Sequence, residues 1–274
     1  MIKYLKLNNK IKMPIIGLGT WKLIGKSCTE VVDKALSLGY NHIDTAEIYM
    51  NEEAIGKALK KFERKNIFIT SKVWPENLTY YRILSSFNQS VSLLGKDYLD
   101  QYLLHWPNKK LNYNDIIKAF SELYKRRLIR SFGVSNFTIH HLKDIIPICK
   151  SFKLPLTVNQ VEFHPFLNKK SLLDFCNIHN IKIVAYSPLA QGKISDNEIL
   201  QKIGKKYIKT PTQITLRWII QNNLIAIPKA SSINHLIENL NIFDFELTKE
   251  DVNEIDSLNK NERLVNPSFA EFEY

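Results

Sequence analysis

Residues 67–72 read IFITSK, an apolar and β-branched run that ends in a lysine. Such a short apolar run is typical of a buried strand, and an unpaired charge buried at its end costs several kcal/mol. The lysine, Lys72, therefore needs an acidic partner. Asp44, which ends the preceding β-rich run at 42–44, is the natural one. The pair predicts two neighbouring strands that end at the same rim of a sheet.

Short β-rich runs of this kind recur along the chain and alternate with helical stretches. The eight predicted strands cover residues 14–17, 42–44, 67–72, 99–105, 129–134, 156–161, 182–186 and 225–228. Eight such units in about 250 residues match a closed (β/α)8 TIM barrel better than an open parallel sheet. We therefore predict one α/β barrel domain over residues 1–274. Residues 4–12, centred on Asn8 and Asn9, predict an N-terminal β-hairpin that plugs the bottom of the barrel.

Helix start and stop signals lie between the predicted strands. Ser, Thr and Asn are favoured at the position before a helix, and Gly just after its end. The predicted starts are Ser27 with Glu30, Asn51, Thr138, and Thr248 with Asp251; the predicted stops are Gly39 and Gly95.

Composition places the 274-residue chain among soluble globular proteins, with 45% hydrophobic and 24% charged residues. No apolar run approaches the ~20 residues that span a bilayer, and the N-terminus lacks the apolar region of a signal peptide. The three cysteines are widely spaced without a C-x-x-C pair, which argues against a disulfide framework or a zinc site. We expect a cytoplasmic protein with no metal and no membrane partner.

The chain carries 38 Lys and Arg against 27 Asp and Glu, a net charge of +11. This excess has three explanations: a polyanionic partner, an anionic small ligand, or a lysine-rich surface that arose by drift in an A/T-rich genome. The basic residues are spread over most predicted helices and are not clustered with aromatic residues, which argues against nucleic-acid binding. We interpret most of the excess as lysine-rich surface.

Polar side chains stand at the C-terminal ends of seven predicted strands, the rim at which TIM barrels carry their chemistry. Each alone has a structural explanation, such as a turn for Asp44, a core histidine for His105 or a helix cap for Ser135. Folding alone does not readily explain the whole set on one rim. Its members are Asp44, Lys72, His105, Ser135 with Asn136, Asn159 with Gln160, Tyr186 with Ser187, and Lys229.

These segments resemble the aldo-keto reductase superfamily over essentially the whole chain. The matching blocks, in order, are GLGTW at 17–21, DTAEIY at 44–49, ITSKVW at 69–74, YLLHWP at 102–107, GVSNF at 133–137, VNQVEFHP at 158–165, AYSPL at 185–189 and IPK at 227–229. The ending RLVNPS at 263–268 and the stretch NFTI at 136–139 are most similar to the bacterial 2,5-diketo-D-gluconate reductases, in particular their B-type.

The resemblance implies NAD(P)H-dependent reduction of an aldehyde or ketone to an alcohol, with 2,5-diketo-D-gluconate or methylglyoxal-type carbonyls as substrates. The developing negative oxygen needs a proton donor, and Tyr49 is the expected general acid. Lys72 is expected to lower the pKa of Tyr49, while Asp44 holds Lys72 in place. His105 is expected to act as a neutral hydrogen-bond donor that orients the substrate oxygen.

The resemblance also implies the cofactor and substrate contacts. Tyr186 offers a flat face to the nicotinamide, and Ser135, Asn136 and Gln160 can bond its carboxamide. The other expected cofactor-binding residues are Gly19, Thr20, Ser187, Leu189, Gln191, Lys229, Ser231, Ser232, His235, Glu238 and Asn239. Trp21, Trp74 and Trp106 are expected to wall an apolar substrate pocket, with ordinary core packing as the alternative for each.

One position departs from the family's pattern. The residue after Lys229 is usually Ser, and an Arg five residues further on grips the 2′-phosphate of NADPH. Here those positions hold Ala230 and His235, so the bidentate guanidinium is missing. We expect NADPH as the cofactor, with NADH tolerated better than in relatives that keep the Arg.

A different class of function remains open at this point: a cofactor-binding regulatory or interaction subunit on the same fold, since fold alone does not fix function. The complete set of Asp44, Tyr49, Lys72 and His105 favours an enzyme. Resemblance further implies a monomer whose substrate choice depends on the loops after strands four and seven and on the tail, residues 261–274.

Overall fold

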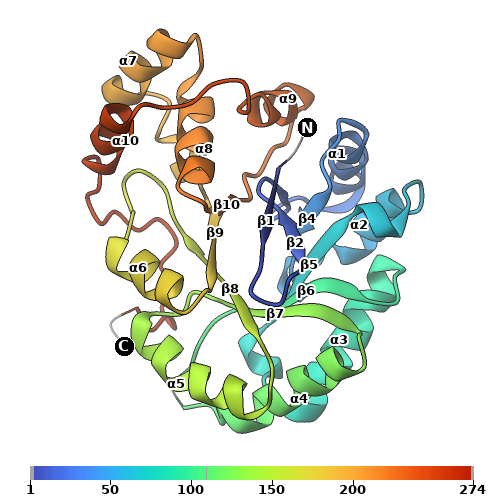
Figure 1. Cartoon of the computed structure of the whole chain (residues 1–274). Coiled ribbons are helices and arrows are strands. Elements are labelled where there is room, and N and C mark those ends of the chain that lie inside the picture. Colours follow the sequence, from blue (N-terminus) through green and yellow to red (C-terminus); the bar gives the residue numbers. More distant parts are fainter. Residues whose placement is uncertain (1–2, 109, 273–274) are drawn as a thin grey trace.

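The computed structural model describes residues 3–108 and 110–272, so residues 273 and 274 of the predicted specificity tail lie outside it. Strands β3 to β10 form one eight-stranded parallel sheet in the order β10-β9-β8-β7-β6-β5-β4-β3, which curls around the centre of the molecule (Figure 1). The first and last strands of the sheet meet, because Gly17 N donates to Ala226 O at 2.9 Å and Gly19 N to Pro228 O at 3.1 Å. The predicted (β/α)8 barrel is confirmed.

The strand positions follow the sequence pattern closely. They are β3 (Leu18–Gly19), β4 (His42–Asp44), β5 (Phe68–Val73), β6 (Leu99–Leu104), β7 (Ile129–Ser135), β8 (Leu156–Glu162), β9 (Lys182–Tyr186) and β10 (Ile225–Ala226). The first predicted strand, 14–17, was placed too early. Pro14 still belongs to β2, Ile16 makes a single bridge to Ala226 at the closing seam of the barrel, and the strand itself is Leu18–Gly19. A Cβ at Gly19 would lie 2.6 Å from Ile227 O, so a residue without a side chain is needed where this seam closes.

The predicted N-terminal hairpin is also confirmed. Strands β1 (Tyr4–Lys6) and β2 (Lys12–Pro14) pair antiparallel. Asn8 Nδ2 donates to Leu156 O at 2.7 Å and Asn9 Nδ2 to Arg130 O at 2.9 Å. Both acceptors lie at the starts of barrel strands, so the hairpin closes the end of the barrel opposite the polar rim.

Helices surround the sheet and bury their apolar faces against it (Figure 1). They are α1 (Gly25–Ser37), α2 (Glu52–Leu59), α3 (Tyr80–Leu94), α4 (Tyr113–Lys125), α5 (Ile139–Ser151), α6 (Lys170–Ile178), α7 (Glu198–Tyr207), α8 (Pro211–Gln221), α9 (Ile233–Leu240) and α10 (Lys249–Asp256).

Most helix signals match the structure. Thr138 caps α5, and Thr248 caps α10 with Asp251 in a reciprocal capping box. The predicted capping box at Ser27 and Glu30 was wrong. The helix α1 begins earlier, at Gly25, whose left-handed φ of 54° turns the chain directly into the helix.

Asn51 occupies the position before α2, as predicted, but its side chain does not cap the helix. Its amide instead donates to the carbonyl oxygens of Thr20 and Leu23 at 2.9 Å each. The Thr45 hydroxyl donates to its Oδ1 at 2.6 Å. Asn51 therefore fastens the loops after β3 and β4 to each other at the polar rim.

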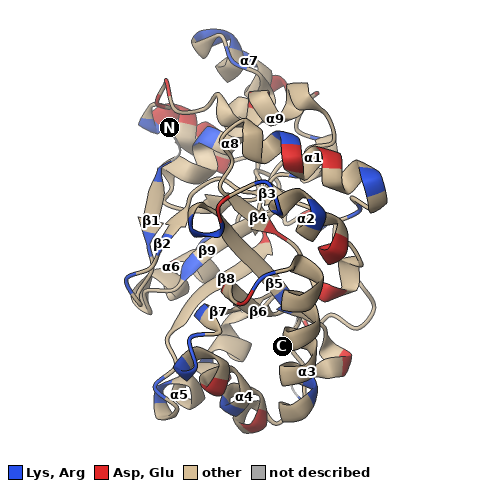
Figure 2. Ribbon diagram, turned by 90° about the vertical axis from the view of Figure 1, so that its right-hand side faces the viewer, with Lys and Arg blue, Asp and Glu red and all other residues tan. Residues whose placement is uncertain are grey.

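The charged residues lie mostly on the outer helices, where Lys and Arg alternate with Asp and Glu (Figure 2). Many are paired across or along helices, as in Lys57 with Glu53 and Lys202 with Glu254. No helix among residues 3–108 and 110–272 is long and apolar enough to cross a membrane. The three cysteines are buried and unpaired.

Candidate active site

Lys72 and Asp44 form a buried ion pair at the C-terminal end of the barrel, as the opening run of sequence predicts. Lys72 Nζ lies 2.5 Å from Asp44 Oδ1 and donates to the Thr45 carbonyl oxygen at 2.8 Å. Gln160 Nε2 donates to the other Asp44 oxygen at 2.7 Å. Burial raises the pKa of the Asp44 carboxyl and lowers that of the Lys72 ammonium, while their mutual attraction opposes both shifts.

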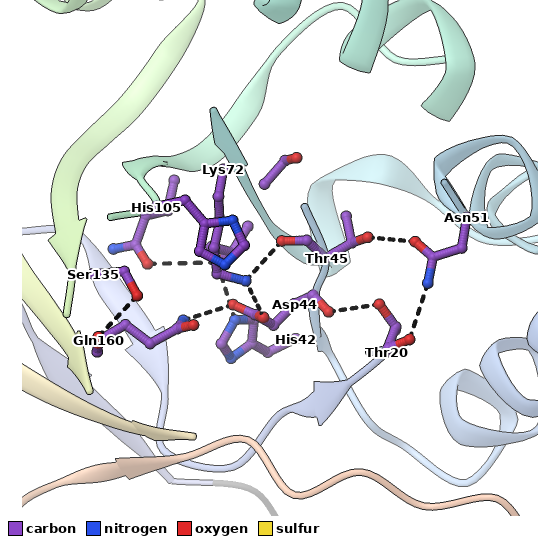
Figure 3. A network of polar contacts seen from close by, with 12 residues as sticks. Thr20, His42, Asp44, Thr45, Asn51, Lys72, His105, Ser135 and Gln160 are labelled. Atoms are coloured by element: carbon purple, nitrogen blue, oxygen red, sulfur yellow. Dashed lines mark hydrogen bonds and ion pairs between the residues drawn. The ribbon is translucent and has the colours of Figure 1, made fainter. Parts of the chain in front are cut away.

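The ion pair belongs to a continuous network of hydrogen bonds (Figure 3). The Thr20 hydroxyl donates to the Asp44 carbonyl oxygen at 2.8 Å, and Asn51 joins Thr20 to Thr45. These bonds connect β3, β4, β5 and the start of α2. The position of Lys72 is therefore fixed by the folded chain itself.

Tyr49 ends the short 3₁₀ helix η1 (Glu47–Tyr49), and its ring lies over this ion pair. Lys72 Nζ is 5.1 Å from the centre of the ring, and the His105 ring meets it edge to face at 5.7 Å. Removal from water raises the pKa of Tyr49 well above its usual value, and the charge of Asp44 adds to the shift. The expectation of a lowered pKa was wrong, because removal of the hydroxyl from water dominates and the charge of Asp44 acts in the same direction. Tyr49 is held as a neutral hydroxyl that can donate a proton.

His105 follows β6 directly and is 7% exposed. Burial lowers the pKa of His105 well below its usual value, and the nearby Lys72 charge adds to this effect. The ring is therefore neutral, as expected from the sequence. Its Nδ1 is buried without a hydrogen-bond partner among the residues that the structure describes, and its ring meets the Trp74 ring edge to face at 5.1 Å between centres.

A cavity of about 620 Å³ opens above these residues. Trp21, Trp74 and Trp106 line it. Trp106 is also only 5% exposed, because Phe269 and Phe272 of the tail pack against its ring. Lys72 lies just beneath the cavity and does not reach it. The other predicted residues that line the cavity are Gly19, Thr20, Asp44, Tyr49, His105, Ser135, Asn136, Gln160, Tyr186, Ser187, Gln191 and Lys229.

Backbone conformation at two strand ends is unusual on this rim. Asn136 follows β7 with φ of 65° and Ser187 follows β9 with φ of 47°, both in the left-handed region. Such conformations cost free energy for residues with side chains and gather at functional sites. Here they turn the chain so that both residues face the cavity.

The Asn136 side chain links the residues expected to hold the nicotinamide to those expected to move the proton. The Tyr186 hydroxyl donates to Asn136 Oδ1 at 2.7 Å. Asn136 Nδ2 donates to the His105 carbonyl oxygen and to the Ser135 hydroxyl, each at 3.1 Å. The Tyr186 ring is thereby held at a fixed place on one wall of the cavity.

The predicted residues for the far end of the cofactor lie outside this cavity. Ser232 caps α9 through the His235 amide at 3.2 Å, and the His235 side chain is exposed. Leu189, Ser231, Glu238 and Asn239 likewise do not line the cavity.

Asn239 carries a feature that fits a bound adenine. It is 1% exposed, and neither Oδ1 nor Nδ2 has a hydrogen bond of ordinary geometry to a residue that the structure describes, although its amide lies close enough to the Tyr40 hydroxyl to affect the pKa of Tyr40. Buried amides are almost always bonded, so an orphaned one indicates a missing polar partner. An adenine edge offers one donor and one acceptor and suits this amide. The residues of the chain therefore fit a nicotinamide adenine dinucleotide.

Several cavity residues were missed by sequence reasoning. Lys22, Ile48 and Ile227 line it beside predicted residues, and the tail contributes residues 264–267 and Phe269. The tail is anchored by Glu162, which had also not been singled out. The sequence contained a pattern that could have identified Glu162. It stands two positions after Gln160, and side chains two apart on a strand share a face.

The comparison with protein families decides the assignment, since the model described as "Aldo/keto reductase family" matches residues 15–260. The chain belongs to the aldo/keto reductase family. Glyoxal reductase of Bacillus subtilis (strain 168) is 46% identical over 262 residues, which cover 94% of each chain. A solved structure whose name refers to 2,5-diketo-D-gluconic acid reductase B is 32% identical with a TM-score of 0.93, covering 99% of this reductase and 97% of that chain.

A third similar protein was solved with a cofactor. It is an aldo-keto reductase of the silkworm Bombyx mori, complexed with NADPH. It is 31% identical with a TM-score of 0.92, covering 98% of this aldo-keto reductase and 91% of that chain. The resemblance found in the sequence blocks is confirmed, and the chain is an oxidoreductase by family.

Proposed function

We propose that this protein reduces small aldehydes and ketones, with NADPH as the hydride donor. One observation carries the proposal: the neutral Tyr49 hydroxyl, the Lys72–Asp44 ion pair and the neutral His105 ring stand together at the floor of one cavity. Glyoxal and methylglyoxal, whose two carbonyls are adjacent, and 2,5-diketo-D-gluconate are the proposed substrates. The similarity to a glyoxal reductase supports the first of these.

The residues of the chain have separate roles in the proposed reaction. When bound, the reduced nicotinamide supplies the hydride that the carbonyl carbon accepts. Tyr49 donates its proton to the carbonyl oxygen, and Lys72 stabilises the resulting tyrosinate because its charge lies 5.1 Å from the ring centre. Asp44 keeps Lys72 in place and compensates its buried charge. His105, being neutral, donates a hydrogen bond to the substrate oxygen without protonating it.

Cofactor binding is proposed to use the two groups of residues described above. Tyr186, Ser135, Asn136 and Gln160 hold the nicotinamide, and Asn239 bonds the adenine. The remaining proposed contacts are Gly19, Thr20, Ser187, Leu189, Gln191, Lys229, Ser231, Ser232, His235 and Glu238. Because Ala230 and His235 replace the usual Ser and Arg, we expect weaker selection of NADPH over NADH than in relatives with the Arg.

The apolar cavity walls support small or apolar carbonyl substrates. Trp21, Trp74 and Trp106 contribute aromatic surface, and Phe269 packs edge to face against Trp74 at 5.6 Å. We propose a single-domain, cytoplasmic monomer. Size-exclusion chromatography with light scattering tests the oligomeric state.

The experiment that tests the function is a substrate panel. Glyoxal, methylglyoxal, 2,5-diketo-D-gluconate and an aromatic aldehyde are each assayed with NADPH and with NADH by the loss of nicotinamide absorbance. Turnover of at least one carbonyl that is abolished in Tyr49→Phe supports the proposal. Tight NADPH binding with no turnover of any carbonyl would instead favour the regulatory subunit.

A further inference from the structure

Glu162 is a buried carboxylate with no role in the reaction described so far. It is the last residue of β8, two positions after Gln160, and its side chain is 0% exposed. It lines a second, smaller hollow of about 270 Å³, together with Arg263 of the tail. A carboxylate buried to this extent needs several donors to offset its lost hydration.

The C-terminal tail supplies most of those donors. The Leu264 amide donates to Glu162 Oε1 at 2.8 Å, and the Val265 amide donates to Oε2 at 3.1 Å. The Arg263 guanidinium lies 3.5 Å from Oε2, and His164 Nε2 lies 3.1 Å from Oε1. Three consecutive residues of the tail are therefore bound by one side chain of the barrel.

The tail segment that follows forms an outer wall of the active-site cavity. Residues 264–267 and Phe269 line it. The Phe269 ring lies 5.6 Å from that of Trp74 and 5.5 Å from that of Trp106, edge to face in both cases. Glu162 itself does not line the cavity, so its bonds to the tail connect it to the cavity wall at that side.

We propose that Glu162 is a positioning residue that holds the tail over the cavity and so determines how tightly the carbonyl substrate binds. The proposal rests on the proposed reductase function and adds a specificity role to it. Glu162 does not contact Tyr49, but it pairs with Tyr186 across β8 and β9, and burial together with the Glu162 charge raises the pKa of Tyr186. The tail contacts are the more direct link to the substrate, so we expect the larger effect on KM for the carbonyl, and the Kd of NADPH is measured beside it to detect an effect through Tyr186.

The chemistry of the contact requires a carboxylate. Each oxygen of Glu162 accepts a hydrogen bond from a backbone amide, which cannot become an acceptor, and the Arg263 guanidinium forms an ion pair with Oε2. In Glu162→Gln the side chain keeps its size, but an NH2 group replaces one oxygen. Whichever oxygen is replaced, the NH2 group then faces a backbone amide donor, that of Leu264 or that of Val265. The backbone amide that faces the new NH2 group loses its acceptor and is left buried and unpaired. The tail conformation held against Glu162 therefore becomes less favourable.

The test compares Glu162→Gln with Glu254→Gln, a matched control. Glu254 lies on α10, is paired with Lys202 of α7 and loses the same charge at a residue that neither lines the cavity nor contacts Leu264 or Val265. Steady-state kinetics with glyoxal and methylglyoxal, NADPH affinity by fluorescence titration, and hydrogen exchange of the peptide spanning residues 260–272 are measured for both. Folding is checked by thermal denaturation, and kinetics are taken well below the midpoint.

For Glu162→Gln we expect KM for the carbonyl to rise about tenfold, while kcat and the Kd of NADPH change less than about threefold. This is the pattern expected when the substrate and its transition state lose the same binding free energy. The Leu264 and Val265 amides should exchange faster. The control should match the wild type in all four measurements. Phe269→Ala, which leaves the anchor intact and removes the wall, should raise KM similarly without releasing those two amides.

Unchanged exchange at Leu264 and Val265 in Glu162→Gln would overturn the anchoring role. Faster exchange with unchanged KM would overturn the role in specificity, and an equal fall of kcat and NADPH affinity would show a general structural defect instead. If Glu162→Gln does not fold, Phe269→Ala decides whether the tail wall affects KM, and an unchanged KM there also overturns the proposal. If the wild type reduces no carbonyl, the proposed function fails, whereas the exchange measurement still decides the anchoring role.

Discussion

The two ends of the proposed cofactor and substrate region are built in different ways. At the reacting end, Asp44, Lys72 and Gln160 are at most 3% exposed and bonded to one another before any ligand is present. At the adenine end, the His235 side chain is exposed, and the buried Asn239 amide, which lies near the Tyr40 hydroxyl, has no hydrogen bond of ordinary geometry within residues 3–108 and 110–272. The reacting end is assembled by folding, and the adenine end is left for the cofactor to complete.

The difference has an energetic reason. Groups that stabilise charge in a transition state work best when they are fixed beforehand, since they need no reorganisation during the reaction. Groups that recognise a ligand need unsatisfied donors and acceptors for that ligand to bond. Substitutions at the reacting end should therefore alter turnover or stability, and those at the adenine end should alter cofactor affinity.

The largest expected effect is at the reacting end. Tyr49→Phe removes the proposed acid, so kcat for carbonyl reduction should fall by about 10²–10⁴-fold, while the Kd of NADPH changes less than about twofold. Single-turnover kinetics and fluorescence titration measure the two quantities. Tyr102→Phe is the matched control, because the Tyr102 hydroxyl is buried away from the cavity without a partner. A Tyr49→Phe variant that keeps most of its kcat would remove Tyr49 from the mechanism.

The next effect tests whether folding depends on the same residues. Lys72→Met leaves the Asp44 carboxylate buried without its partner, so the free energy of unfolding should fall by about 3–5 kcal/mol. Adding Asp44→Asn should restore most of that loss but none of the turnover. Urea denaturation and kcat measurements on both variants check this. If the variant with both Lys72→Met and Asp44→Asn recovered kcat as fully as its free energy of unfolding, the ion pair would serve folding alone.

A smaller effect is expected at the adenine end. His235→Arg supplies the bidentate guanidinium that the chain lacks, so the preference for NADPH over NADH should increase about tenfold, with kcat unchanged. The ratio of the two Kd values, determined by titration, measures this. His235→Gln controls for loss of the ring. A wild-type preference already above about 10³-fold would contradict the weaker discrimination inferred from His235.

The smallest effect concerns the barrel interior beneath the reacting end. His42 shares a face of β4 with Asp44, and burial, helped by the Lys72 charge, lowers its pKa to about 3. Its value in the unfolded chain is near 6.5, so below that pH the unfolded state takes up a proton that the folded state does not. Stability should therefore fall as the pH drops, by up to about 1.4 kcal/mol per unit for this residue.

The variant His42→Gln should show a shallower decrease of unfolding free energy between about pH 6.5 and 5. Urea denaturation across that range measures the slope. Above about pH 7.5 the slopes of wild type and variant should coincide, which serves as the internal control. Identical slopes over the acidic range would mean that His42 is protonated in the folded protein.

The reacting end could be predicted from the sequence because local patterns determine it. An apolar run that ends in Lys72 is a strand with a buried charge, and the end of the preceding strand supplies Asp44. The regular alternation of strands and helices then brings His105, Ser135 and Tyr186 to the same rim, as the structure has them.

The remaining parts depend on contacts that no local pattern encodes. The resemblance implied that the tail, residues 261–274, affects substrate choice. Leu264, however, meets Glu162 across 102 residues of sequence, so this contact was not predictable from either segment. The pKa of Tyr49 depends first on exclusion of water and then on the Asp44 charge, and the motif reveals neither. The start of α1 was misplaced because the left-handed turn at Gly25 outweighs the capping pattern at Ser27.

The seam between Gly19 and Lys229 also bears on how the protein is made in a cell. These residues bridge the first and last strands of the barrel, and the loop that follows Gly19 contributes to the same cavity as Lys229. A chain emerging from the ribosome completes its last strand only after about two hundred further residues have followed the first. Until then the barrel stays open along one edge, so a stalled or truncated nascent chain should be inactive and exposed to chaperones and proteases.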